Sequence, residues 1–215
     1  MLGFVVSTCA LTAPSPGKPA GVVGRRAASA IVIPGLATVL SPALPAQAAG
    51  LNSFTDSRYG VSFGLPAGWE AVPNNLADGR RIVLATDPKD ESTNIFIAFT
   101  PIRPDYSSLG SFGNIDYVAS TVIPQCGSNG ECRFANGDAI EGRMLSQETV
   151  KGNYVYEYTI EQKQGPKRRL RSLFTIQADG ASSILIGLTC QCLDYQNADV
   201  GSMFQEVLAS YRGKA

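Results

Sequence analysis

Apolar and polar residues alternate over most of the chain beyond residue 51, which is the pattern of strands with one buried face. Val61, Phe63 and Leu65, for example, alternate with small or polar residues before a turn. Turn-forming residues such as Lys151-Gly152 separate the later segments. We therefore predict strands over residues 61–65, 81–86, 94–100, 139–149, 153–162, 167–177 and 181–193.

Two segments follow the helical period instead. One apolar stripe runs over residues 115–123, with Asn114 placed to cap the helix and Pro124 placed to end it. A second stripe runs from Val200 to Tyr211. Strands grouped together with helices laid across them predict an α+β domain.

Three tyrosines share one face of the predicted strand over residues 153–162. Tyr154, Tyr156 and Tyr158 alternate with mostly polar residues on the other face. Such a stripe is able to form a ligand-binding face, but the pattern is that of a half-buried antiparallel strand. We expect these rings to belong to the core or the sheet surface.

The first 48 residues have the features of a targeting signal. No acidic residue occurs before Asp56, and the twin arginines Arg25 and Arg26 precede a weakly apolar run. The run closes with Ala46-Gln47-Ala48, so cleavage is expected after Ala48. A Sec signal and an uncleaved anchor are the alternatives. The Ser-, Thr- and Pro-rich stretch ahead of the arginines is typical of a plastid presequence, or of an import signal for a plastid with extra membranes.

Residues 49–215 are predicted to form one domain. Three of the 18 basic residues lie in the signal, so 15 basic and all 18 acidic residues remain. This slightly acidic balance gives no bulk attraction to nucleic acid. Histidine is absent from the sequence, which excludes Ser-His-Asp and Cys-His catalysis and every histidine zinc site.

Four cysteines follow the predicted cleavage site, and three disulfide connectivities are possible. Cys126 and Cys132 flank a turn-rich stretch, where a small disulfide loop is plausible in an exported protein. Cys190 and Cys192 would point to the same face of a strand, where a bridge is geometrically awkward. We expect these two to be buried free thiols.

Several short motifs occur in one order and spacing along the chain. They are Phe54-Thr-Asp56, Tyr59-Gly60-Val-Ser-Phe63, Pro66-x-x-Trp69, the Asp87-Pro88 turn before Asn94-Ile-Phe-Ile-Ala, Ser111-Phe112-Gly113, Tyr154-Val-Tyr156-Glu-Tyr158, and the closing strand and helix from Ile184 to Tyr211. In this order they resemble the PsbP domain of oxygenic photosynthesis over most of residues 54–211. The resemblance implies a central antiparallel sheet with helices on both faces, an α-β-α sandwich.

The resemblance also implies a function. It suggests a non-enzymatic protein of the thylakoid lumen, extrinsic to the membrane, that associates with photosystem II and helps its oxygen-evolving centre retain calcium and chloride. Paralogues of the family act instead in photosystem II assembly or repair, or with photosystem I or the NDH complex. Two departures favour a paralogue: a short arm between Ala48 and Phe54, and no histidine to make the metal contacts of some members.

Two clusters are candidate sites. Lys167, Arg168, Arg169 and Arg171 form the densest run of charge, which would dock on an acidic lumenal surface or merely keep a hairpin edge solvated.

Asp87, Asp90 and Glu91 offer oxygen ligands for calcium, but they lack the spacing of a high-affinity loop, and an ordinary polar turn is the alternative. A more distant hypothesis is an exported thiol-dependent redox enzyme built on Cys190 and Cys192.

Overall fold

A computed structural model describes residues 50–122, 140–162 and 165–214. The predicted disulfide and the predicted targeting signal lie outside these ranges. The residues concerned are Cys126, Cys132, Arg25, Arg26, Ala46 and Ala48.

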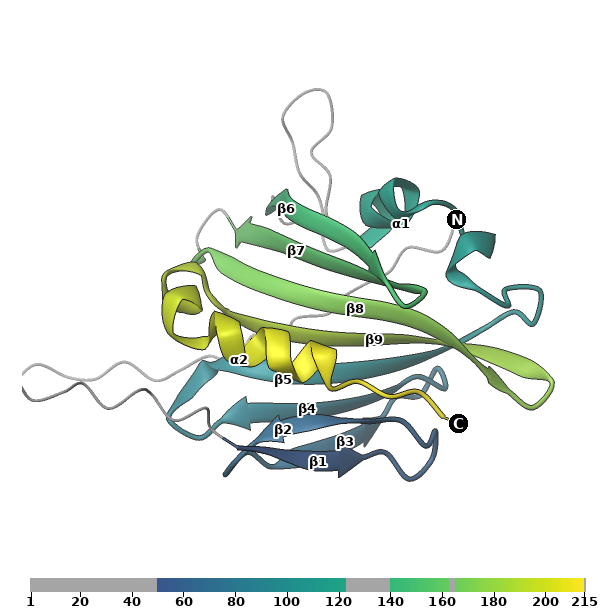
Figure 1. Ribbon diagram of the computed structural model, residues 1–215, viewed down its shortest axis with the longest axis horizontal. Coiled ribbons are helices and arrows are strands. Elements are labelled where there is room, and N and C mark those ends of the chain that lie inside the picture. Colours follow the sequence, from purple (N-terminus) through teal and green to yellow (C-terminus); the bar gives the residue numbers. More distant parts are fainter. Residues whose placement is uncertain (1–49, 123–139, 163–164, 215) are drawn as a thin grey trace, which may run out of the picture. The chain divides into compact units, whose positions relative to one another are not determined.

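A seven-stranded antiparallel sheet forms the centre of the fold, with strand order β3-β4-β5-β9-β8-β7-β6 (Figure 1). The first three strands, β3 to β5, form one half of the sheet. The last four strands form the other half, in which β6 lies at the edge and β9 lies innermost and pairs with β5. The strands are β3 (Ala71–Asn75), β4 (Arg81–Asp87), β5 (Asp90–Ile102), β6 (Ile140–Val150), β7 (Asn153–Gln162), β8 (Arg168–Asp179) and β9 (Ser182–Leu193).

A separate two-stranded sheet precedes the large one. It consists of β1 (Leu51–Thr55) and β2 (Ser62–Pro66). The C-terminal segment is tied to it, because the amides of Ser62 and Arg212 each donate to the other residue's carbonyl, at 2.9 and 2.8 Å. The predicted strands over the described residues are confirmed, whereas β1 and β3 were not predicted.

The two predicted helices are confirmed as α1 (Ile115–Val122) and α2 (Asn197–Ala209). Short 3-10 turns, η1 (Leu109–Ser111) and η2 (Asp194–Gln196), precede them. Asn114 caps α1 as predicted, since its Oδ1 accepts the amide of Tyr117 at 2.8 Å. Within the described residues, no helix is both long and apolar enough to cross a bilayer.

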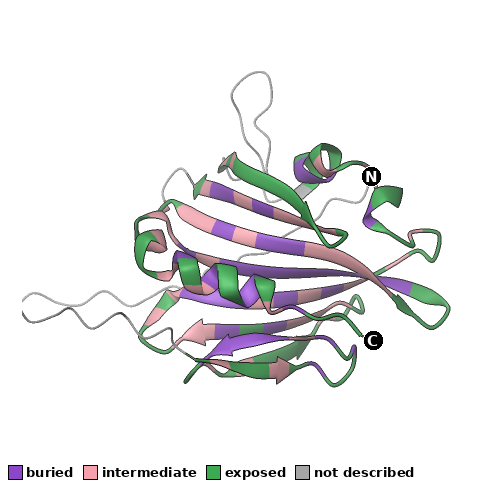
Figure 2. Ribbon diagram, viewed as in Figure 1, coloured by how far each residue is buried: buried purple, intermediate pink, exposed green. Residues whose placement is uncertain are grey.

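Figure 2 shows buried residues along the central strands and on α2. The buried apolar side chains pack in two clusters. In the larger one, Phe204 and Val207 of α2 pack with β2, β4, β5 and β9. In the smaller one, Val118 of α1 packs with Tyr156 and Tyr158 of β7. Each fully buried large apolar side chain contributes about 1.5–3 kcal/mol.

The tyrosine stripe of β7 belongs to the core beneath α1. Tyr156 and Tyr158 are buried, and the hydroxyl of Tyr156 donates to the carbonyl of Ile115 at 2.9 Å. The hydroxyl of Tyr154 donates to the carbonyl of Gly113 at 3.2 Å. The expectation that these rings are structural is therefore confirmed.

Candidate partner-docking site

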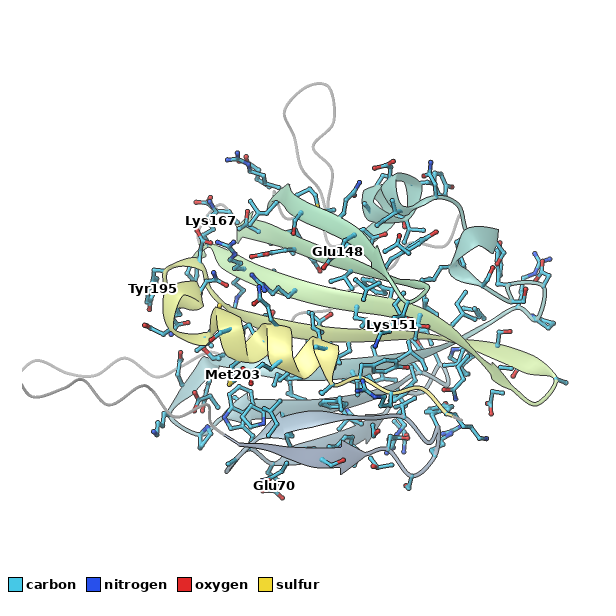
Figure 3. The ribbon with its side chains drawn as sticks, in the orientation of Figure 1. Glu70, Glu148, Lys151, Lys167, Tyr195 and Met203 are labelled. Carbon is cyan, nitrogen blue, oxygen red and sulfur yellow. The ribbon has the colours of Figure 1, made fainter. Side chains whose placement is uncertain are left out.

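The predicted basic cluster lies where β8 begins. Arg169 and Arg171 alternate with Leu170 along the strand, so they share the face on which Leu173 packs with the α2 cluster. Lys167 precedes the strand and lies near η2, at the end of the sheet where Figure 3 also places Tyr195. The cluster thus lies at the beginning of β8, beside the start of α2.

Glu157 neutralises part of this charge from the neighbouring strand. It lies directly opposite Arg171 in the β7–β8 register. Its Oε1 accepts from Nε of Arg169 at 2.6 Å, and its Oε2 lies 2.9 Å from Nη2 of Arg171. All three side chains are partly buried, so this carboxylate holds both guanidinium groups on the sheet.

Asp194 of η2 adds a second carboxylate. It lies 3.7 Å from Nζ of Lys167 and 3.8 Å from Nη1 of Arg169. Its backbone amide also donates to the carbonyl of Lys167 at 2.9 Å. The turn before α2 is therefore anchored to the chain segment that enters β8.

Lys167, Arg169 and Arg171 thus pair with two carboxylates, which leaves an excess of positive charge. The side chain of Arg171 is 14% exposed, whereas that of Lys167 is 41% exposed. Arg168 reaches sideways and donates from Nη1 to the carbonyl of Ser92 at 3.3 Å. Arg169 and Arg171 are largely engaged with carboxylates, so the exposed Lys167 is the residue of the cluster best placed to contact a partner. Arg168 is partly buried, and its described hydrogen bond is to a backbone carbonyl rather than to a carboxylate.

The structure adds an aromatic side chain that the sequence did not single out. Tyr195 is 76% exposed, the highest exposure among the large apolar side chains that the structure describes. It follows Asp194 directly and so lies beside the basic cluster. Tyrosine is enriched at protein interfaces. In the sequence, Tyr195 lies outside the apolar stripe of α2, and this position could have identified it as exposed.

The three carboxylates proposed for calcium do not converge on one point. Oδ1 of Asp87 accepts the amide of Lys89 at 2.8 Å, which is the hydrogen bond of a polar turn. Among the residues that the structure describes, no three acidic, cysteine or histidine side chains group as metal ligands would. A calcium site formed by Asp87, Asp90 and Glu91 stays a prediction that this geometry does not favour.

Asp90 instead organises a hydrogen-bond network between β5 and η2. The hydroxyl of Ser92 donates to its Oδ1 at 2.7 Å and that of Thr93 to its Oδ2 at 3.1 Å. The side-chain amide of Gln196 also donates to Oδ2, and its Oε1 accepts the amide of Leu193 at 2.9 Å. The Ser92 hydrogen bond is the main cause that lowers the pKa of Asp90 from 3.8 to about 2.

We expect this network to make stability depend on pH. Because the pKa of Asp90 is lowered by folding, its contribution is complete above about pH 4 and is lost as pH falls through about 2. Asp90→Asn should lower stability at neutral pH by about 1 kcal/mol after solvent screening, or about 2–4 °C in melting temperature. Melting curves of both proteins from pH 7 to pH 2 should converge at the acid end, and a constant difference would contradict this role.

The two C-terminal cysteines are buried free thiols, as expected from the sequence. Both belong to the larger core cluster and have no exposed surface. Burial is the main cause that raises the pKa of the Cys190 thiol, and it raises the pKa of Cys192 to about 11. Since the thiolate is the reactive form, this environment disfavours the hypothesis of a thiol-dependent enzyme.

Native-state labelling should reflect this burial. At pH 8 only about a thousandth of Cys192 would be ionised, so alkylation of Cys190 and Cys192 should be at least about a hundredfold slower in the folded protein than in urea. Mass spectrometry of the labelled peptides measures each site separately. Rapid labelling of either residue in the folded protein would revive the thiol hypothesis.

The fold and this site define a class of protein: an antiparallel α+β domain whose recognisable chemistry is a charged surface beside an exposed aromatic ring. The PsbP family model matches residues 49–213. The chain therefore belongs to the PsbP family, which confirms the resemblance seen in its motifs.

Individual relatives agree with this assignment. PsbP domain-containing protein 3, chloroplastic, of Arabidopsis thaliana is 26% identical over 163 residues, which is 74% of this chain and 63% of that protein. This chain thus spans less than two thirds of that relative.

The solution structure of cyanobacterial PsbP (CyanoP) from Synechocystis sp. PCC 6803 matches with a TM-score of 0.56 and 20% identity, over 81% of this chain and 98% of that one. That likeness supports the fold. The structure of LpqN from Mycobacterium tuberculosis matches with a TM-score of 0.43 and 12% identity, over 76% and 90% of the two chains.

Proposed function

We propose that this chain is a non-enzymatic auxiliary protein of the thylakoid lumen that docks on photosystem II during its assembly or repair. The observation that supports this role most directly is the likeness to a PsbP domain-containing protein of a chloroplast, 26% identical over 163 residues. The twin-arginine signal predicted over residues 1–48 agrees with transfer into the lumen.

A permanent extrinsic subunit of photosystem II, which helps retain calcium and chloride, is the main alternative. The short arm between Ala48 and Phe54 and the absence of histidine argue for the auxiliary role. Association with photosystem I or the NDH complex is a further alternative of the same kind. These possibilities share the requirement for a docking surface.

We assign docking to the basic cluster and Tyr195. Lys167 and Arg168 offer positive charge to an acidic lumenal surface, and Tyr195 offers a rigid aromatic ring that is mostly exposed. Glu157 and Asp194 hold the neighbouring arginines in place, so the charged surface is preorganised. The protein would lie at the membrane surface, bound to protein rather than to lipid.

The proposal includes the three-layer arrangement expected from the sequence. Leu170 packs in the α1 cluster and Leu173 in the α2 cluster. Side chains an odd number of residues apart in a strand point to opposite faces of the sheet. This alternation supports a helix on each face and assigns Arg169 and Arg171 to the face of α2.

Rebinding to salt-washed thylakoid membranes, opened to expose the lumenal surface, tests the docking chemistry. The protein should bind at low salt and be released as NaCl rises toward 1 M, where the screening length falls to about 3 Å. Bovine serum albumin, added at the same concentration, controls for non-specific retention. Binding that survives 1 M NaCl and is released only by detergent would contradict a charge-driven contact with protein.

A further inference from the structure

A second candidate site lies away from the basic cluster of β8. A depression of about 260 Å³ lies between the turn joining β6 to β7, the far end of β8 and the segment that follows α2. Lys151, labelled in Figure 3, projects from that turn near the end of α2. The lining residues are Lys151, Asn153, Thr175, Gln177, Tyr211 and Lys214, with Ile176, Arg212 and Gly213.

The lining is strongly one-sided in charge. Lys151, Arg212 and Lys214 contribute three cations from two separate elements, and none of the described residues that line the depression is acidic. Nη1 of Arg212 donates to the carbonyls of Ala209 and Tyr211 at 2.9 and 2.7 Å, so the two lysines are the cations left for a ligand. The turn sets the position of Lys151, which adopts a positive φ of 51° followed by Gly152 at 81°, as hairpin turns of this kind require. Like charges gathered in this way repel one another unless an anion lies between them.

A buried hydroxyl group provides an independent observation. Tyr211 is only 9% exposed, and its ring packs in the larger core cluster. Its hydroxyl oxygen is buried and has no hydrogen-bond partner among the described residues. A buried hydroxyl without a partner is unfavourable, and Tyr211 lines the same depression as Lys151 and Lys214, which indicates a missing acceptor.

The hydroxyl of Tyr211 and the side chain of Gln177 both lie close to Gly213. A Cβ atom placed on Gly213 would lie 3.9 Å from the hydroxyl oxygen of Tyr211 and 3.9 Å from Oε1 of Gln177. Gln177 is already engaged, because its Oε1 accepts the amide of Lys214 at 3.1 Å and its Nε2 donates to the carbonyl of Tyr59 at 2.9 Å. Of these two side chains, Tyr211 is therefore the one left to donate.

We propose that this depression binds the carboxylate of an aspartate or glutamate side chain on a protein partner. The carboxylate would accept from the hydroxyl of Tyr211 and be neutralised by Lys151 and Lys214. Pockets for free small molecules are typically larger, about 300–1,000 Å³, and mostly apolar. Most residues that line this depression are polar or charged, which fits one acidic side chain of a docked surface.

The proposal goes beyond the docking role of Lys167 and Arg168, because it concerns different residues and a defined chemical group. It is tested without any photosynthetic complex, so its failure and that of the proposed function are distinguishable. The probe is sodium propionate, which has the chemistry of a glutamate side chain, and the matched control ligand is neutral propionamide. Both are titrated into ¹⁵N-labelled protein at constant ionic strength.

Propionate should shift the amide signals of Asn153 and Gly213 with saturation, whereas propionamide should not. Tyr211→Phe should weaken binding at least fivefold while keeping the melting temperature of the unliganded protein, since it removes a hydroxyl that has no described partner. Lys151→Gln should weaken binding similarly. Lys89→Gln, in the exposed turn between β4 and β5, should leave it unchanged.

Two results would overturn the proposal. One is a linear, unsaturated response that is the same for both ligands. The other is saturable propionate binding that Tyr211→Phe and Lys151→Gln leave intact, since the anion would then bind elsewhere.

Discussion

Replacing Asp56 with alanine is expected to lower the free energy of unfolding by about 3–5 kcal/mol, which would leave little of the stability of an ordinary domain. Asp56 is 1% exposed, and its Oδ1 accepts the amides of Arg58 and Tyr59, each at 3.0 Å. Its Oδ2 lies 2.9 Å from Nη2 of Arg81, whose side chain is also largely buried. Removing the carboxylate leaves a buried cation and two amides without their acceptor.

Urea denaturation of the two proteins measures this difference. Asp78→Ala is the matched control, because Asp78 pairs with its neighbour Arg80 at 2.6 Å but both side chains are exposed. Such an exposed pair is screened by solvent and contributes little to stability. A loss below 1 kcal/mol for Asp56→Ala would show that the hairpin of β1 and β2 does not depend on this ion pair.

Reversing the charge of the two accessible basic residues should reduce docking strongly. We expect Lys167→Glu combined with Arg168→Glu to weaken binding to salt-washed, opened thylakoid membranes by roughly ten- to a hundredfold, because attraction becomes repulsion against an acidic partner. Folding should be little affected, since the pair of Lys167 with Asp194 is partly exposed and 3.7 Å long, and Arg168 is held by a single long hydrogen bond to the carbonyl of Ser92. Binding isotherms at low salt measure the effect.

A control variant with the same change in net charge distinguishes an effect of this surface from an effect of the overall charge. Arg80→Glu combined with Arg103→Glu alters two arginines near the other end of β4 and β5, each of which pairs with a local aspartate. This control should bind within about twofold of the unaltered protein at moderate salt. Equal losses in both double variants would mean that net charge rather than this surface governs binding.

Much of the fold was predictable from the sequence because one face of each long strand is buried. The alternation in β7 and the helical stripes of α1 and α2 follow directly from that burial. β1 and β3 escaped prediction for a physical reason. Each is five residues long and mostly exposed, and β3 contains Pro73 at the sheet edge, so neither has an apolar period.

The site was predictable only in part. The run from Lys167 to Arg171 is recognisable in the sequence as a charge cluster. Which of its residues pair with carboxylates and which stay exposed depends on strand register. Glu157 lies 14 residues before Arg171 along the chain, and only the pairing of β7 with β8 brings them together. Asp194 and Tyr195 reach the cluster through η2, a short turn with no sequence period. Register and turn geometry are set by the whole sheet.

The Asp87–Glu91 segment shows how little nearness along the chain says about a binding site. Three carboxylates close in sequence suggested a cation site, yet side chains of a tight turn diverge and accept hydrogen bonds from their own backbone. Nearness along the chain is therefore weaker evidence than convergence in space.

Quantitative mass spectrometry of separated thylakoid complexes tests the central proposal most directly. We expect the protein, with a mature N-terminus at Ala49, to be enriched with photosystem II assembly or repair intermediates and to be depleted from them by high salt. Salt-sensitive presence in mature photosystem II, at one copy per reaction centre, would support the extrinsic-subunit alternative instead. Co-migration with photosystem I or the NDH complex alone would contradict the account.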